Sequence, residues 1–267
     1  MSEYQILLTN DDGIKSPGLW AAAEALSTLG FVTVVAPREQ SSGMGRSLPI
    51  TSDGIIQEER LQIKGQDWPV YAVGGTPAQA VLHGILEVMS QKPDIIVSGI
   101  NYGLNVGTGI TISGTVGAAM EAAALGFRAL AVSLETAQEH HLTYSRDVDF
   151  SGAAHFTLQF ARFLLEKLPF PDVDLLKVDV PDNATPNTEW LLTRLARQRY
   201  YDPVAPARKS WSVPGTVGYK EAPRLEEEPS DSDVFVLRKE RLVSVTPISL
   251  DMTSRVDFGD LERHYQS

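Results

Sequence analysis

The chain has 267 residues, of which 43% are hydrophobic and 21% charged, an ordinary globular composition that excludes an intrinsically disordered protein. Its 23 basic and 34 acidic residues give a net charge of −11 with no basic stripe, which argues against DNA or RNA as a polymeric partner. The absence of cysteine excludes disulfides, thiolate metal sites and a cysteine nucleophile.

The N-terminus passes directly into an apolar run, without the basic segment and long apolar core of a secretion signal. No stretch of the sequence approaches the length of an apolar membrane span. We therefore expect a cytoplasmic protein with no membrane partner.

From the N-terminus to about residue 180, short β-branched apolar runs alternate with Ala-rich stretches of helical period. Runs such as Ile6-Leu7-Leu8 are continuous rather than alternating, as expected for strands covered on both faces by helices. The pattern predicts a doubly wound α/β fold with a mostly parallel sheet. In chain order we expect strand 5–9, helix 17–29, strands 32–36 and 70–73, helix 77–89, strand 94–98, helix 114–125, strand 129–134, helix 150–167 and strand 175–180.

Beyond residue 180 this alternation stops, and Pro, Gly, Trp and Tyr punctuate short extended pieces such as residues 209–219. The runs 234–237 and 242–246 read as a β-hairpin. We expect a catalytic core over residues 1–180 and a hairpin-rich C-terminal extension over residues 181–267 that serves as an oligomerisation arm.

Three polar clusters each follow one of the predicted strands: Asn10-Asp11-Asp12-Gly13, Gln40-Ser41-Ser42-Gly43 and Ser98-Gly99-Ile100-Asn101. Because the carboxyl ends of parallel strands gather at one edge of a sheet, where ligands bind, the three clusters predict one site. Each cluster taken alone also fits an ordinary turn in which Asn, Asp or Ser side chains cap the backbone.

Two adjacent carboxylates, Asp11 and Asp12, repel each other unless a cation lies between them, and Gly13 permits the turn that brings them together. With a hydroxyl from Ser41 or Ser42 and the amide oxygen of Asn101 they form an all-oxygen set. Such a set suits Mg²⁺, Mn²⁺ or Ca²⁺ rather than zinc.

Ser113-Gly114-Thr115 stands at the start of a predicted helix, where free backbone N–H groups and the helix dipole favour a phosphate. An ordinary N-cap is the alternative for this segment.

The chain lacks a Walker A loop, a Gly-x-Ser-x-Gly elbow and a Gly-x-Gly-x-x-Gly turn after the first strand. The five histidines lack zinc-binding spacing, so we assign them helix-surface or loop roles.

The segment from Ile6 to Gly13, followed by Ser16-Pro17-Gly18, resembles the N-terminal signature of the SurE family of survival-protein nucleotidases. Further segments resemble that family in the same order, among them Gly75-Thr76-Pro77-Ala78, Ser113-Gly114-Thr115-Val116 and Val243-Ser244-Val245-Thr246-Pro247. The resemblance covers nearly the whole chain.

The resemblance implies a Rossmann-like core, a homodimer or homotetramer with an exchanged C-terminal arm, and metal-dependent hydrolysis of nucleoside 5′-monophosphates, with 3′-monophosphates as a further candidate substrate. It implies one divalent cation, Mg²⁺ or Mn²⁺ in the cell, with Ca²⁺ as an alternative occupant in crystals. The metal ligands that it implies are Asp11, Asp12, Ser42 rather than Ser41, and Asn101, with Asp11, Asp12 and Asn101 as the catalytic residues. The substrate phosphate is expected to contact Asn10, Gly43, Asn105, Ser113, Gly114 and Thr115.

The chain departs from the family pattern at Gln79 and Ala80, where Asp-Cys is frequent, at Ile112, where Tyr is common, and at Ala122, where Gly is common. None of these changes removes an expected ligand, and no side chain is assigned as the acid for the leaving group. The alternative to a phosphatase is a non-catalytic nucleotide or phosphate sensor with the same metal pocket. A structural assembly protein is a further alternative.

Overall fold

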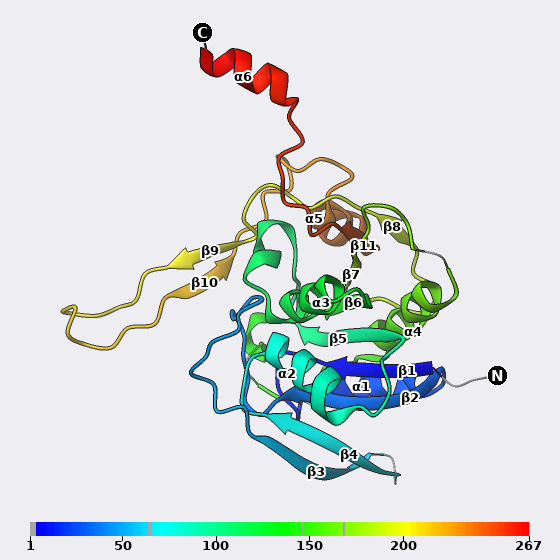
Figure 1. Cartoon of the computed structure of the whole chain (residues 1–267). Helices are drawn as coiled ribbons and strands as arrows, with labels where there is room; N and C mark the ends of the chain where they lie inside the picture. The colour runs from blue at the N-terminus through cyan, green and yellow to red at the C-terminus, as the bar shows by residue number, and fades with distance from the viewer. Residues whose placement is uncertain (1–3, 64–65, 142, 146, 168, 267) are drawn as a thin grey trace.

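The fold is built on one nine-stranded sheet, shown in Figure 1 for a computed structural model that describes residues 4–63, 66–141, 143–145, 147–167 and 169–266. The sheet order is β3-β4-β2-β1-β5-β6-β7-β11-β8, and the run from β4 to β7 is parallel throughout. β3 and β11 each pair antiparallel with a neighbour, β4 and β7 respectively. The strands are β1 (Tyr4–Thr9), β2 (Gly30–Pro37), β3 (Ile56–Ile63), β4 (Gln66–Val73), β5 (Ile95–Tyr102), β6 (Arg128–Leu134), β7 (Leu175–Val180), β8 (Trp190–Leu192) and β11 (Val243–Ile248).

Helices cover both faces of the sheet. Ile6 and Leu8 pack with residues of α1 (Pro17–Leu26) and α4 (Ser151–Glu166), whereas Leu7 packs with residues of α2 (Pro77–His83) and α3 (Gly114–Ala124). The continuous apolar runs are therefore buried on both sides, and the expected doubly wound, mostly parallel α/β fold is confirmed.

The predicted helix at residues 17–29 ends earlier, at Leu26, and the one at residues 77–89 continues past α2 as a π-helical turn, Gly84–Val88. The predicted strand 70–73 is the end of a longer strand, β4, which begins at Gln66. β4 forms a hairpin with β3, a strand that the sequence pattern does not predict. Short 3-10 turns cover Gly107–Thr111 and Gln138–His140.

The predicted hairpin of residues 234–237 with 242–246 is wrong. Ser232 caps a short helix, α5 (Asp233–Phe235), by accepting a hydrogen bond from the Phe235 N–H at 3.1 Å, and a π-helical turn, Val236–Glu240, follows. Val234 and Leu237 bury themselves in a small cluster with Leu104 and Tyr200. A run of four apolar residues fits a helical turn as well as a strand, and here the capped start favours the helix.

Two strands from beyond residue 180, β8 and β11, complete the main sheet, so residues 1–180 and the C-terminal region share it. A separate two-stranded sheet, β9 (Tyr201–Val204) with β10 (Gly218–Glu221), forms an arm that projects from the body in Figure 1. Of the extended pieces predicted over residues 209–219, only residues 218 and 219 belong to a strand.

The last helix, α6 (Phe258–Gln266), stands away from the body at the C-terminal end in Figure 1, and none of its residues is buried. Among the residues that the structure describes, no helix combines the length and the apolar character needed to cross a membrane.

Candidate metal and phosphate site

The turn after β1 is held by its own first residue. The Asn10 side chain donates from Nδ2 to the Gly13 carbonyl and accepts from the Gly13 N–H, both at 3.1 Å. Gly13 adopts a positive φ of 98°, as the sequence predicted. Asn10 is fully buried and does not line the cavity described below, so its amide shapes the turn.

Asp11 is fixed by the start of α3. The Thr115 hydroxyl donates to Asp11 Oδ1 at 2.5 Å, and Thr115 is itself fully buried. Gly114 lies so close that a Cβ at this position would sit 2.7 Å from the Asp11 Cβ. Two residues expected at the substrate phosphate thus support the Asp11 carboxylate instead of facing the cavity.

Asp12 is held from β5 and from the loop after β2. Its Oδ2 accepts from the Tyr102 backbone N–H at 3.1 Å, and its Oδ1 accepts from Gln40 Nε2 at 3.4 Å. Asp12 is 2% exposed and Asp11 4% exposed, so both carboxylates are removed from bulk water by the packing around the turn.

The two neighbouring carboxylates are electrostatically unsatisfied. Burial raises the pKa of Asp11, and burial together with the charge of Asp11 raises the pKa of Asp12 well above its usual value. Within the described parts of the chain, neither carboxylate forms an ion pair with a basic side chain. A divalent cation would supply the missing positive charge, and an all-oxygen donor set fits Mg²⁺ or Mn²⁺.

Two neutral oxygens complete this set. Asn101 Nδ2 donates to the carbonyls of Tyr102 at 3.1 Å and Gly103 at 2.8 Å, which leaves its side-chain carbonyl oxygen free as an acceptor. The Ser41 hydroxyl donates to the Glu39 carbonyl at 3.1 Å, whereas Ser42 faces the cavity. Geometry therefore favours Ser42 over Ser41, in agreement with the family resemblance. We call Asp11, Asp12, Ser42 and Asn101 the metal edge.

Backbone hydrogen bonds bring the separate loops of the metal edge together. The Ser41 N–H donates to the Asp11 carbonyl at 2.7 Å, and the Gly45 N–H donates to the Ile112 carbonyl at 3.0 Å. The loop after β2 is thereby tied both to the turn after β1 and to the segment that starts α3.

A cavity of about 450 Å³ opens at the metal edge. Ser113 lines it while capping α3, since Ser113 Oγ accepts from the Val116 N–H at 3.1 Å and keeps its own O–H to donate. Asn105 donates from Nδ2 to Ser133 Oγ at 2.8 Å and also lines the cavity. The sequence-predicted residues that line this cavity are Asp11, Ser42, Gly43, Asn101, Asn105 and Ser113.

The far side of the same cavity comes from segments that the sequence did not assign to the site. Tyr201, Pro203, Val217 and Tyr219 belong to the arm, and His141 and Arg199 complete this side. The sequence predicts an assembly role for residues 181–267, which include this arm, and helix-surface or loop roles for the histidines. No local pattern links residue 141 to residue 219, so only the three-dimensional fold reveals their proximity.

The departures from the family pattern fall mostly outside the cavity. Gln79 forms a capping box with Thr76 at the start of α2, in which Gln79 Oε1 accepts a hydrogen bond from the Thr76 N–H at 3.0 Å. Ala80 and Ala122 are buried in the helices α2 and α3. Ile112 alone lines the cavity, with 64% of its surface exposed.

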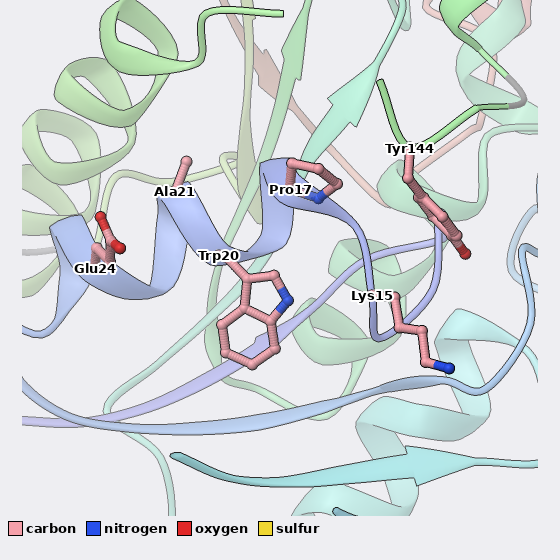
Figure 2. A pocket seen from close by; sticks show the side chains of 6 residues that line it. All are labelled: Lys15, Pro17, Trp20, Ala21, Glu24 and Tyr144. Carbon is pink, nitrogen blue, oxygen red and sulfur yellow. The ribbon is translucent and has the colours of Figure 1, made fainter. Parts of the chain in front are cut away.

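A second hollow, of about 610 Å³, lies along α1, next to the turn that follows β1 (Figure 2). It is open to solvent and is lined by Lys15, Pro17, Trp20, Ala21, Glu24 and Tyr144. Tyr144 donates its hydroxyl to the Asp12 backbone carbonyl at 2.9 Å. None of the residues of the metal edge lines this hollow, so we do not assign the site to it.

Comparison with known proteins matches residues 6–202 to the family model described as survival protein SurE. A protein of Thermococcus gammatolerans named 5′-nucleotidase SurE is 44% identical, with 97% of this chain and 94% of that protein covered. Proteins of the same name from Thermococcus kodakarensis and Archaeoglobus fulgidus are each 42% identical, over 97% of this chain and 97% and 96% of their own lengths.

Among solved structures, the chain is similar to the SurE protein of Aquifex aeolicus, with a TM-score of 0.72 and 29% identity. The match covers 98% of this chain and all of the other. The similarity therefore includes the C-terminal region as well as the parallel sheet.

Proposed function

The chain belongs to the SurE family and is an enzyme of the 5′-nucleotidase class, and we propose that it hydrolyses nucleoside 5′-monophosphates, and 3′-monophosphates as a second substrate class, with one divalent cation held at the metal edge. The products are a nucleoside and inorganic phosphate. Mg²⁺ or Mn²⁺ is the working cation, and Ca²⁺ fits the same oxygen ligands.

The observation that carries the proposal is the pair of buried carboxylates, Asp11 and Asp12, with no basic ion-pair partner among the described residues. The hydroxyl of Ser42 and the free carbonyl oxygen of Asn101 offer neutral ligands beside Asp11 in one cavity. A cation held by these residues would supply Lewis acidity for the attack of water on phosphorus.

The chain's own groups orient the reactants. Thr115 and Gly114 hold the Asp11 carboxylate in place, and Gln40 with the Tyr102 N–H holds that of Asp12. Ser113, which keeps an O–H to donate at the start of α3, is placed to bind a phosphoryl oxygen. Gly43 and Asn105 line the same cavity and complete the proposed phosphate contacts.

The C-terminal region fits an assembly role. On α6, Phe258 is 61% exposed, Leu261 39% and Tyr265 79%, and the helix has no buried residue. We propose that this helix and the arm pack against another copy of the chain in a homodimer or homotetramer, where the apolar face of α6 would be covered.

The test is phosphate release from adenosine 5′- and 3′-monophosphates by protein stripped of metal with a chelator and then supplied with Mg²⁺ or Mn²⁺. We expect turnover only after a cation is added. Metal-independent turnover would contradict the proposed mechanism. Nucleotide binding with no phosphate released, at high protein concentration and with every cation tried, would favour the sensor.

A further inference from the structure

The arm forms one side of the cavity that the metal edge opens into. Tyr201 and Pro203 of β9 line it, as do Gly218 and Tyr219 of β10. The cavity volume of about 450 Å³ lies in the range typical of small-molecule sites, roughly 300–1,000 Å³. A ligand held at the metal edge by its phosphate would therefore extend toward the arm.

The Tyr219 ring is fixed on one side by His141. The two rings are stacked, with centroids 6.1 Å apart and planes at 17°, and the Tyr219 hydroxyl lies 2.9 Å from His141 Nδ1. His141 Nε2 faces the Thr136 carbonyl at 3.3 Å, so Nε2 carries the proton and Nδ1 accepts from the tyrosine. Burial lowers the pKa of His141, in keeping with this neutral ring.

A second tyrosine supports the same ring. Tyr201 contacts Tyr219 edge-to-face at 5.4 Å between centroids, and Gln138 Nε2 donates to the Tyr219 backbone carbonyl at 2.9 Å. With these contacts made, Tyr219 still exposes 38% of its surface in a cavity-lining position. We call His141, Tyr201 and Tyr219 the arm wall.

Direct contacts join the arm wall to the metal edge. The His141 ring packs on Gly103, where a Cβ would sit 2.6 Å from Nε2, and the Gly103 carbonyl accepts from Asn101 Nδ2 at 2.8 Å. Tyr201 donates its hydroxyl to the Leu104 carbonyl at 3.4 Å. The segment that carries the metal ligand Asn101 thus also supports the aromatic wall.

We propose that Tyr219, oriented by His141 and Tyr201, is the surface on which the base of the nucleotide stacks. The arm then makes the enzyme prefer nucleotides over phosphate esters that have no base, while the metal edge acts on the phosphate of either. This inference rests on the proposed function. A preformed, exposed ring is suited to the task because it loses little conformational entropy on binding, and stacking of one base on an aromatic side chain contributes about 1–3 kcal/mol.

The experiment compares kcat/KM for adenosine 5′-monophosphate with kcat/KM for ribose 5-phosphate, which carries the same phosphoryl group without a base. In Tyr219→Leu the ratio of the two should fall by about 10-fold, since each 1.4 kcal/mol is a factor of ten. Turnover of ribose 5-phosphate should stay the same. Tyr219→Phe keeps the ring and should keep the ratio within about threefold of the wild-type value, because the loss of one neutral hydrogen bond is a small effect.

Trp211→Leu is the matched control. This residue is 94% exposed, lies between the two arm strands and does not line the cavity, so the ratio should not change. An unchanged ratio in Tyr219→Leu, or equal losses for both substrates, would overturn the stacking role.

If the wild-type protein releases no phosphate from any nucleotide in the presence of metal, it is the proposed function that fails. The stacking role of the arm wall is then tested by calorimetry, which measures the affinities for adenosine 5′-monophosphate and ribose 5-phosphate. Tighter binding of the nucleotide that Tyr219→Leu abolishes would support the wall, and equal affinities for both ligands would overturn it.

Discussion

Asp11, Ser42 and Asn101 of the metal edge line the same cavity as the arm wall. The metal edge is built at the ends of buried parallel strands, whereas the arm wall is built mainly on an exposed two-stranded arm. At the metal edge, Asp11 and Asp12 are at most 4% exposed and each is held by groups from other parts of the fold. On the arm, Tyr219 is 38% exposed and depends on His141 and Tyr201 for its orientation.

The difference matches what each part has to do. A metal site needs fixed ligands in a water-poor setting, which buried strand ends provide. A surface for the nucleotide base needs only a planar ring in an approximately correct position. An arm whose tyrosine contacts the body of the protein provides such a ring. We therefore expect substitutions at the metal edge to abolish hydrolysis and substitutions in the arm wall to change substrate preference.

Asp12→Asn should have the largest effect and separates the two regions most sharply. It removes a charged ligand of the proposed metal, so kcat/KM for every phosphate ester should fall by about 10³-fold or more, in line with several kcal/mol of lost transition-state stabilisation. The nucleotide to ribose 5-phosphate ratio of any residual activity should stay at its wild-type value. Steady-state kinetics with saturating Mn²⁺ measures both.

The same variant should not be less stable than the wild-type protein without metal. Asp12→Asn replaces one of two adjacent buried carboxylates with a neutral group of the same shape. Its unfolding temperature in chelator should therefore match or exceed that of the wild-type protein. Asp260→Asn, on exposed α6, is the control for activity and stability. Full activity in Asp12→Asn would contradict the metal edge.

Lys177→Met tests the buried ion network that ties a cavity loop to the C-terminal region. Lys177 on β7 is fully buried between Asp179 and Asp233, and its Nζ lies 3.1 Å from Asp233 Oδ2. Asp179 accepts from the Asn105 N–H at 2.9 Å, and Asp233 accepts from the Gly107 N–H at 2.9 Å. The network thus ties a cavity loop to the C-terminal region.

Replacing the Lys177 ammonium with an uncharged side chain leaves the buried carboxylates of Asp179 and Asp233 without their positive partner. We therefore expect Lys177→Met to lower the free energy of unfolding by about 3 kcal/mol. The value lies at the lower end of the usual range because burial already raises the pKa of Asp179 and favours its neutral form. Urea unfolding of metal-free protein measures the loss. Arg263→Met removes an exposed ion pair with Asp260 and should change stability by less than about 0.5 kcal/mol. Equal effects of the two variants would refute the role of the network.

Thr115→Val should have a smaller effect, confined to the metal edge. The change keeps the shape of the side chain but removes the hydroxyl that donates to Asp11 Oδ1. A hydrogen bond to a charged group contributes about 1.5–3 kcal/mol, so kcat/KM should fall by about 10-fold for nucleotide and ribose 5-phosphate alike. Thr157→Val is the matched control, because this buried threonine of α4 donates only to the Ala153 carbonyl. A change in the substrate ratio would show that Thr115 acts on the base side.

The sheet could be predicted because its signal is local. Continuous apolar runs such as Ile6-Leu7-Leu8 require cover on both faces, and the structure supplies it with two helix layers. The run at residues 234–237 misled because four apolar residues do not distinguish a strand from a helical turn. Its fate was decided by the cap at Ser232 and by packing against Leu104 and Tyr200.

The proximity of three residues of the metal edge was also predictable, here from the topology of the sheet. Asp11, Ser42 and Asn101 follow strands whose carboxyl ends meet at one edge, so topology alone brings them together. The roles of Thr115 and Asn10 could not be predicted from the sequence, since a hydroxyl at a helix start can face a phosphate or a carboxylate. The arm wall depends on contacts between residues far apart in the chain, such as His141 with Tyr219, which no sequence period encodes.

The most direct test of the account is a crystal structure of the protein with Mn²⁺, in which anomalous scattering locates the metal. We expect one strong peak in contact with oxygens of Asp11, Asp12, Ser42 and Asn101, and none at this position in Asp12→Asn. A Mn²⁺ ion bound elsewhere, with the metal edge empty in an enzyme that is active in the same buffer, would contradict the central claim.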